Sequence, residues 1–193
     1  LGEEHGSRRD DAEYVWTIDP IDGTKAFITA KPMFGTLIGL AWRGRPILGV
    51  IDQPVLHERW IGAVGRPTLF NGEVAQTRRC PALDLAILNA TTPDMFVGED
   101  RSAFTQLAGA VKHPLYGGDC IAYGLLASGF IDLVVEAGLK PWDFFALAPI
   151  IEGAGGKMTD WLGRALRLDS DGRVVAAGDP GLHALAIARL GMV

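Results

Sequence analysis

The feature that most constrains this chain is an apolar run of strand-forming residues that ends in two carboxylates. The run from Tyr14 to Ile18 is followed by Asp19-Pro20-Ile21-Asp22-Gly23-Thr24. Apolar β-formers bounded by proline and glycine predict a buried strand that runs into a turn. The turn is stiffened by its proline, which fixes its own φ and restricts the residue before it. Asp19 and Asp22 are therefore predicted at the end of a strand, where side chains can converge on a ligand.

Two carboxylates held this close repel each other unless a cation or a proton lies between them. Ligands that are all oxygen favour a hard cation, Mg²⁺ before Zn²⁺. The same motif also fits a turn in which an aspartate caps a helix and Gly23 relieves backbone strain. Taken alone, the motif leaves both interpretations open.

Further acidic residues lie before and after this motif in the sequence. Glu3 and Glu4 precede it, and Asp143 follows Pro141-Trp142 far downstream. The spacing predicts a helix over residues 141–153, because proline suits a first turn and two glycines follow the segment. Asp143 would then project from the first turn of a helix, where a carboxylate can cap the helix or bind metal.

The motifs together are more specific than any one of them. The order G-E-E, W-x-I-D-P-I-D-G-T and P-W-D followed by A-G-G resembles the inositol monophosphatase family of Mg²⁺-dependent, Li⁺-sensitive phosphatases. The resemblance extends from Gly2 to the C-terminal helix. It implies a layered αβαβα sandwich of the inositol monophosphatase and fructose-1,6-bisphosphatase type, and a homodimer. Family members carry further helices before the G-E-E motif, so we expect the N-terminal part of the family fold to be missing here.

The resemblance also implies a role for each motif residue. The first Mg²⁺ would be held by Glu3, Asp19 and the carbonyl of Ile21, and the second by Asp19, Asp22 and Asp143. Glu3 would share a third, weaker ion through water. In such a site the catalytic residues are Glu3, Asp19 and Thr24: Thr24, hydrogen-bonded toward Glu3, would orient the attacking water, and the N–H groups of Gly23 and Thr24 would bind phosphate.

Within the family, several segments look more like histidinol-phosphate phosphatase than inositol phosphatase. The most telling is Gly117-Gly118-Asp119-Cys120. The carboxylate of Asp119 suits a substrate with a cationic amine or imidazolium better than it suits a neutral polyol. Glu136, seven residues before Asp143, is the second candidate for substrate binding. The alternative for Asp119 is an N-cap on the helix that follows.

The resemblance therefore implies L-histidinol phosphate as the expected substrate. Inositol 1-phosphate and other sugar or polyol phosphates are the alternatives. A haloacid-dehalogenase-type phosphatase fits less well, because its D-x-D-x-T motif separates the aspartates by one residue and this chain separates them by two. A non-catalytic protein-binding member of the fold is an alternative of another class, and the set of converging acids argues against it, since packing alone has no use for their repulsion.

Composition narrows the classes of partner. Of 193 residues, 48% are hydrophobic and 21% are charged, which is typical of a globular protein. The net charge of −5 argues against a nucleic-acid partner. Cys80 and Cys120 have no metal-type spacing and predict free thiols in the cytoplasm. No apolar run is long enough for a membrane-spanning helix, so no membrane partner is expected.

The predicted fold class is α/β, with an α+β half over residues 1–90 and an α/β half over residues 91–193. Connections in the first half are too short for helical crossovers, so its strands are predicted to be antiparallel. Predicted strands are 15–18, 35–42, 47–53, 58–64, 86–90, 130–136 and 174–177, with a hairpin at 67–72. Predicted helices are 101–111, 119–128, 141–153 and 181–190.

Overall fold

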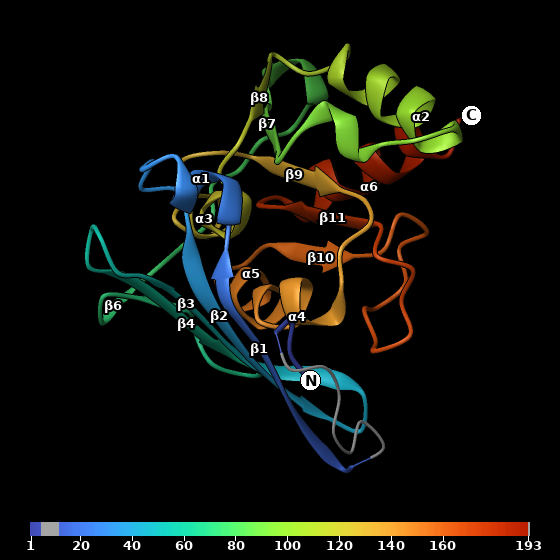
Figure 1. Cartoon of the computed structure of the whole chain (residues 1–193). Helices are drawn as coiled ribbons and strands as arrows, with labels where there is room; N and C mark the ends of the chain where they lie inside the picture. Colours follow the sequence, from blue (N-terminus) through green and yellow to red (C-terminus); the bar gives the residue numbers. More distant parts are fainter. Residues whose placement is uncertain (5–11, 193) are drawn as a thin grey trace.

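The computed structural model describes residues 1–4 and 12–192, and its strands form two sheets (Figure 1). The first sheet has six strands in sequential order, and each neighbouring pair is antiparallel, as predicted. Its strands are β1 (Tyr14–Asp22), β2 (Gly35–Trp42), β3 (Arg45–Gln53), β4 (Glu58–Ala63), β5 (Leu69–Phe70) and β6 (Glu73–Val74).

The second sheet has five strands in the order β10-β11-β9-β7-β8. Strand β7 runs parallel to β8 and β9, whereas β11 runs antiparallel to β9 and β10. These strands are β7 (Ile87–Ala90), β8 (His113–Tyr116), β9 (Leu133–Glu136), β10 (Lys157–Thr159) and β11 (Val174–Ala177). The sheet is thus mixed, and β7, which leads toward the candidate site, lies inside it.

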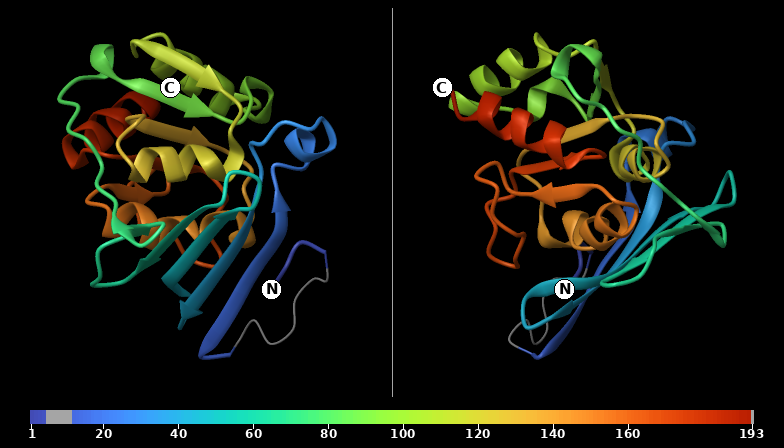
Figure 2. Two further views of the ribbon diagram at one scale, coloured as in Figure 1. Left: turned by 90° about the vertical axis from the view of Figure 1, so that its left-hand side faces the viewer. Right: turned by 180° about the vertical axis from the view of Figure 1, so that it is seen from behind.

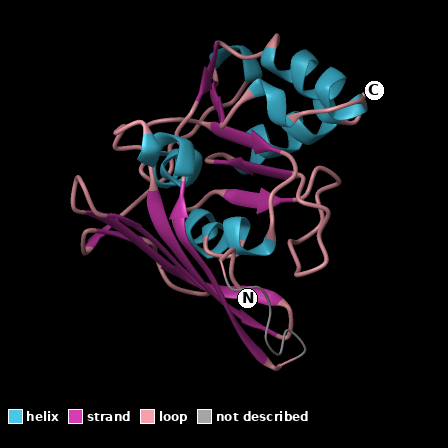
Figure 3. Ribbon diagram, viewed as in Figure 1, coloured by secondary structure: helices cyan, strands magenta, loops and turns pink. Residues whose placement is uncertain are grey.

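Helices fill the space between the two sheets and cover the far face of the second one (Figures 2 and 3). Helices α3 and α5 contact strands of both sheets, while α2 and α6 pack on each other beyond β11. The described residues therefore form four layers of the predicted αβαβα sandwich, in the order sheet, helix, sheet, helix. The helices are α1 (Thr24–Ile28), α2 (Glu99–Ala108), α3 (Asp119–Ala127), α4 (Pro141–Phe144), α5 (Leu147–Gly153) and α6 (Pro180–Leu190), with 3₁₀ turns η1 (Leu83–Leu85) and η2 (Pro93–Met95).

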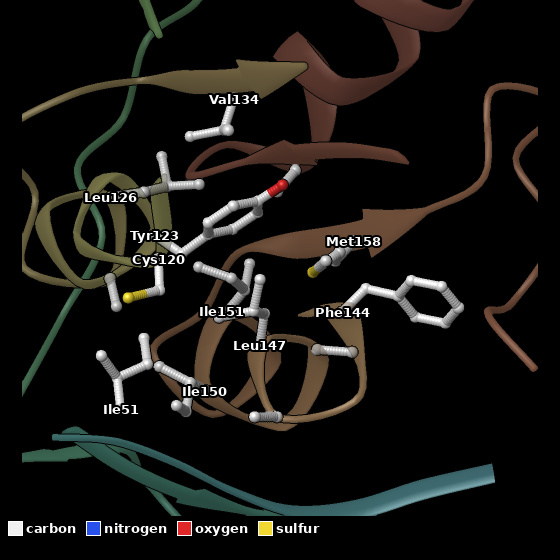
Figure 4. Packing of buried hydrophobic residues seen from close by; sticks show 14 of the residues in the cluster. Ile51, Cys120, Tyr123, Leu126, Val134, Phe144, Leu147, Ile150, Ile151 and Met158 are labelled. Carbon is white, nitrogen blue, oxygen red and sulfur yellow. The ribbon is translucent and has the colours of Figure 1, made fainter. Parts of the chain in front are cut away.

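The larger core lies between the sheets, around α3 and α5 (Figure 4). It draws side chains from both sheets, including Ile51 of β3 and Val134 of β9, and surrounds the buried ring of Tyr123. The link between α4 and α5 lies directly against β3: a Cβ added at Gly49 would lie 1.7 Å from the carbonyl oxygen of Ala146. This close approach requires glycine at position 49.

Strand β1 differs from the fully buried strand that was predicted. Its side chains alternate between exposed and buried, because one face packs on the core and the other faces outward. The strand also continues to Asp22 through an irregular register between Asp19 and Asp22. The exposed side chains of Tyr14, Trp16 and Ile18 are also apolar. The sequence alone therefore predicts a strand that is buried on both faces.

The single helix predicted over residues 141–153 is wrong, since the segment forms α4 and α5. Pro149 has no N–H to donate to the carbonyl of Phe145, so the helical ladder is interrupted at that point. Helix α1 and strands β8 and β10 were not predicted, because each is short and β8 contains a proline. The remaining elements lie within a few residues of their predicted bounds.

The chain passes from the first sheet to the second before β7, a few residues before the predicted domain boundary at residue 90. One core cluster joins residues from both predicted halves. The division into two halves remains a prediction about sequence organisation. No helix in the described part of the chain is both long and apolar enough to cross a membrane.

Candidate metal centre and substrate cavity

Three aspartates from distant parts of the sequence converge at the end of β1. Asp19 and Asp22 come from β1 and Asp143 comes from α4, and one carboxylate oxygen from each lies within 4.8 Å of the others. The irregular register of β1 is what allows both strand aspartates to reach the same point. All three residues belong to the predicted second metal site.

Backbone N–H groups hold each of these carboxylates in place. Asp19 accepts from the N–H of Ile21 at 3.0 Å, and Asp143 accepts from the N–H of Lys140 at 2.7 Å. Asp22 accepts from the N–H of Cys120 at 2.6 Å, which ties the end of β1 to the first turn of α3. Asp143 therefore caps its helix and also joins the cluster, so the two interpretations of this residue are compatible.

The aspartates carry strongly perturbed pKa values. Burial raises the pKa of Asp19 to about 8, with further contributions from the charges of Asp22 and Glu3. Burial likewise raises the pKa of Asp22 to about 7 and that of Asp143 to about 6. Clustered carboxylates that resist ionisation are stabilised by a bound cation. Because the donors are all oxygen, the site fits a hard divalent ion such as Mg²⁺.

Residues of the predicted first metal site lie next to this cluster. Gly2 bridges to Ile18 in parallel, and this pairing brings Glu3 close enough to raise the pKa of Asp19 by its charge and by hydrogen bonding. The hydroxyl of Thr24 donates to the carbonyl oxygen of Ile21 at 3.1 Å. The predicted hydrogen bond from Thr24 toward Glu3 is therefore wrong.

The turn between β1 and α1 requires a glycine. Gly23 has φ +86°, and a Cβ there would lie 2.8 Å from the carbonyl oxygen of Met33. The left-handed conformation places Gly23 at the N-cap of α1, so Thr24 is its first residue. The backbone of Gly23 and Thr24, predicted to bind phosphate, thus turns directly beyond the aspartates.

Asp119 does not cap α3. Gly118 occupies the N-cap position, and the side chain of Asp119 makes no capping hydrogen bond. Its backbone adopts φ +44°, a left-handed conformation that is uncommon for a non-glycine residue. Its carboxylate lies 3.4 Å from the hydroxyl oxygen of Thr91, and burial raises its pKa.

Glu136 is buried at the end of β9, and both of its carboxylate oxygens accept hydrogen bonds from protein donors. One oxygen accepts from the N–H and the hydroxyl of Thr91, at 3.1 and 2.5 Å, and the other from the hydroxyl of Tyr123 at 2.8 Å. Burial raises the pKa of Glu136 to about 7, although these hydrogen bonds oppose the shift. Its position supports Thr91 and, through Thr91, Asp119.

Two adjoining cavities connect these groups. A small one of about 90 Å³ is lined by Asp22, Asp143, Glu136, Thr91 and Asp119, among others. A larger one of about 610 Å³ shares Thr91 and Asp119 with it and extends between α1 and β8. This volume is typical of small-molecule sites. The charged side chains around the larger cavity are Lys25, Lys31 and Asp119.

Sequence reasoning assigned no role to Thr91 or Asn89, although both line the larger cavity. Thr91 stands in the stretch Ala90-Thr91-Thr92-Pro93. Its signal was its place directly after a buried strand, where side chains commonly line a site. Asn89 gave a weaker signal, a polar residue within an otherwise apolar strand.

Comparison with known proteins agrees with the motifs and the geometry. The family model described as "Inositol monophosphatase family" matches residues 1–191. The chain belongs to the inositol monophosphatase family. Its fold is also that of a solved inositol monophosphatase from Zymomonas mobilis, with a TM-score of 0.95 and 50% identity over 99% of this chain and 76% of that one.

Two curated relatives differ in the activity that their names give. The chain is 54% identical to the bifunctional phosphatase IMPL2, chloroplastic, of Arabidopsis thaliana, over 98% of this chain and 57% of that protein. It is 33% identical to a histidinol-phosphatase of Chlorobaculum parvum, over 96% of this chain and 72% of that protein. The chain therefore spans little more than half of the Arabidopsis relative.

Proposed function

We propose that the full-length protein is a Mg²⁺-dependent phosphomonoesterase that converts L-histidinol phosphate into L-histidinol and phosphate. The observation that carries this proposal is the convergence of Asp19, Asp22 and Asp143 within 4.8 Å, two of which, Asp22 and Asp143, line a cavity. Membership of a phosphatase family supports the reaction class. A histidinol-phosphatase among the relatives supports the substrate.

In this proposal the three aspartates, with Glu3 and the carbonyl of Ile21, hold two to three Mg²⁺ ions. Bound Mg²⁺ would neutralise negative charge on the phosphate group and lower the pKa of the attacking water. The N–H groups of Gly23 and Thr24, at the beginning of α1, bind a phosphate oxygen. Thr24, fixed by its hydrogen bond to Ile21, orients the water through its hydroxyl oxygen.

The leaving group of the substrate occupies the larger cavity. Asp119 forms part of the wall common to both cavities, so it is placed between the phosphate and the leaving group. A carboxylate at this position favours a leaving group that carries an ammonium ion. Glu136, which is buried and fully hydrogen-bonded, contributes by holding Thr91 against Asp119.

Inositol 1-phosphate is the second candidate substrate, favoured by the 50% identity to the Zymomonas inositol monophosphatase. A neutral polyol gains less from Asp119 than an ammonium ion does, which places it second. A homodimer in the cytoplasm is proposed from the family resemblance and the two free thiols. Gel filtration and cell fractionation test these two points.

Phosphate release from the full-length protein tests the proposed function. L-histidinol phosphate and inositol 1-phosphate are offered separately, each with Mg²⁺ and with EDTA. We expect turnover that prefers histidinol phosphate, that EDTA abolishes, and that is lost in Asp19→Asn and Asp143→Asn but kept in the exposed control Asp169→Asn. A preference for inositol 1-phosphate would contradict L-histidinol phosphate as the proposed substrate. Release of neither would favour a non-catalytic binding protein.

A further inference from the structure

An asparagine at the wall of the larger cavity has a carboxamide oxygen that accepts no hydrogen bond from the described residues. Asn89 of β7 is 8% exposed, and within residues 1–4 and 12–192 no donor reaches its Oδ1. Its neighbours in the strand, Leu88 and Ala90, face the core cluster on the opposite side of the sheet. A buried polar atom left unpaired costs free energy, and sites that bind a ligand tolerate that cost.

The surroundings of Asn89 differ from those of the charged groups in the same cavity. Asn89 pairs in register with Leu115 of β8, and the cavity is also lined by Met33. These two side chains are apolar, so the cavity offers apolar contact together with a single neutral amide. Its charged groups are Lys25, Lys31 and Asp119.

Asn89, Thr91 and Asp119 line the same cavity. Thr91 follows Asn89 by two residues, so both point to the same face of the sheet at a separation of roughly 7 Å along the chain. The hydroxyl oxygen of Thr91 lies 3.4 Å from the carboxylate of Asp119, while its hydrogen is donated to Glu136. The cavity therefore has the carboxylate of Asp119 beside the aspartate cluster and the neutral amide of Asn89 farther from the cluster.

We propose that Asn89 binds a ring nitrogen of the substrate's imidazole group while Asp119 binds its ammonium group. This inference rests on the proposed function and deepens it, since it assigns the residue that recognises the ring. The carboxamide can accept from a ring N–H or donate to the bare ring nitrogen, because its two ends are nearly equal in shape. A neutral amide suits an uncharged imidazole, whereas a carboxylate suits the cation.

The test compares two substrates that differ only in the ring. L-phenylalaninol phosphate keeps the ammonium and phosphate groups of L-histidinol phosphate but carries a phenyl ring without nitrogen. The kcat/KM of each is measured with the full-length wild-type protein and with Asn89→Leu, Asn89→Val and Asp119→Ala. Melting temperatures are measured for all four proteins.

We expect the wild type to prefer histidinol phosphate and Asn89→Leu to lower that preference about tenfold, through the histidinol phosphate rate alone. Asp119→Ala lowers both rates alike. Because Oδ1 accepts no hydrogen bond from the described residues, Asn89→Leu leaves the melting temperature equal or higher, which a structural role would not allow. Asn89→Val, which carries a smaller side chain, is expected to give the same pattern. It replaces Asn89→Leu in the comparison if the Asn89→Leu protein does not fold.

Equal rates for the two substrates in the wild type, or an unchanged preference in both Asn89 variants, overturn the assignment of Asn89 alone. A parallel loss of both rates with a lower melting temperature also overturns it and makes Asn89 structural. Absence of histidinol phosphate turnover in the wild type overturns the proposed substrate together with this inference.

Discussion

Replacing Asp22 with asparagine should have opposite effects on stability with and without metal. Burial raises the pKa of this carboxyl from 3.8 to about 7, helped by the charges of Asp119 and Glu136 and opposed by hydrogen bonds from Cys120. Each pKa unit corresponds to about 1.4 kcal/mol, so ionised Asp22 destabilises the metal-free fold by up to about 4 kcal/mol at neutral pH. Partial solvent access reduces this to about 2–4 kcal/mol.

The pH dependence of the metal-free protein follows from the sign of this shift. A carboxyl with a raised pKa binds its proton more tightly in the folded state than in the unfolded one. The folded state is therefore favoured most below pH 3.8, and this contribution is lost as the pH rises from about 4 to about 7. Asparagine does not ionise, and its oxygen can still accept from the N–H of Cys120.

Urea unfolding of the wild type and of Asp22→Asn, in EDTA and in millimolar Mg²⁺, measures both effects. At pH 7.5 in EDTA the variant should be more stable by about 2–4 kcal/mol, a rise of roughly 4–16 °C in melting temperature. Addition of Mg²⁺ should stabilise the wild type in proportion to the logarithm of its concentration, and the variant far less. Asp169→Asn, whose side chain is 89% exposed, is the control and should change neither quantity. A variant that is less stable than the wild type in EDTA would refute the electrostatic reasoning.

Three further predictions concern the scaffold. Gly49→Ala should destabilise the fold by about 1–3 kcal/mol or more in urea, because its Cβ would overlap the carbonyl of Ala146; unchanged stability would contradict the packing described. Asp132→Ala should destabilise the fold by about 1–3 kcal/mol, since it removes two hydrogen bonds of 2.7 Å from Arg78 and leaves the N–H of Ile87 without its acceptor; chemical denaturation beside Asp169→Asn measures this. Burial lowers the pKa of His183 from 6.5 to about 4, so the free energy of unfolding should fall by up to about 3 kcal/mol as the pH drops from 6.5 to 4. Urea midpoints recorded against pH measure this slope, which His183→Gln should remove.

Local patterns in the sequence were enough for much of the fold. Strands β2 and β11 have their predicted bounds, because each is a short run of β-formers between clear turn signals. The exposed face of β1 was not foreseen, since apolar residues stand on both of its faces. The break between α4 and α5 could have been inferred from Pro149, which removes a donor from the middle of the expected helix.

The residues of the aspartate cluster were predictable from the sequence, whereas the contacts that hold them and the cavity residues Thr91 and Asn89 were not. Family motifs pointed to Asp19, Asp22 and Asp143, and the fold brings these three together. The hydrogen bond from Cys120 to Asp22 joins residues 98 positions apart, so no local pattern reports it. The buried carboxylate of Glu136, fixed by partners from other elements, likewise depends on how the second sheet is assembled.

Crystals of the protein grown with Mn²⁺ in place of Mg²⁺ would test the central claim most directly, because anomalous scattering locates each ion. The account predicts an anomalous peak coordinated by the carboxylates of Asp19, Asp22 and Asp143, and its loss in Asp143→Asn. Three aspartates without a peak between them, in crystals whose soaking solution saturates the site, would contradict the account.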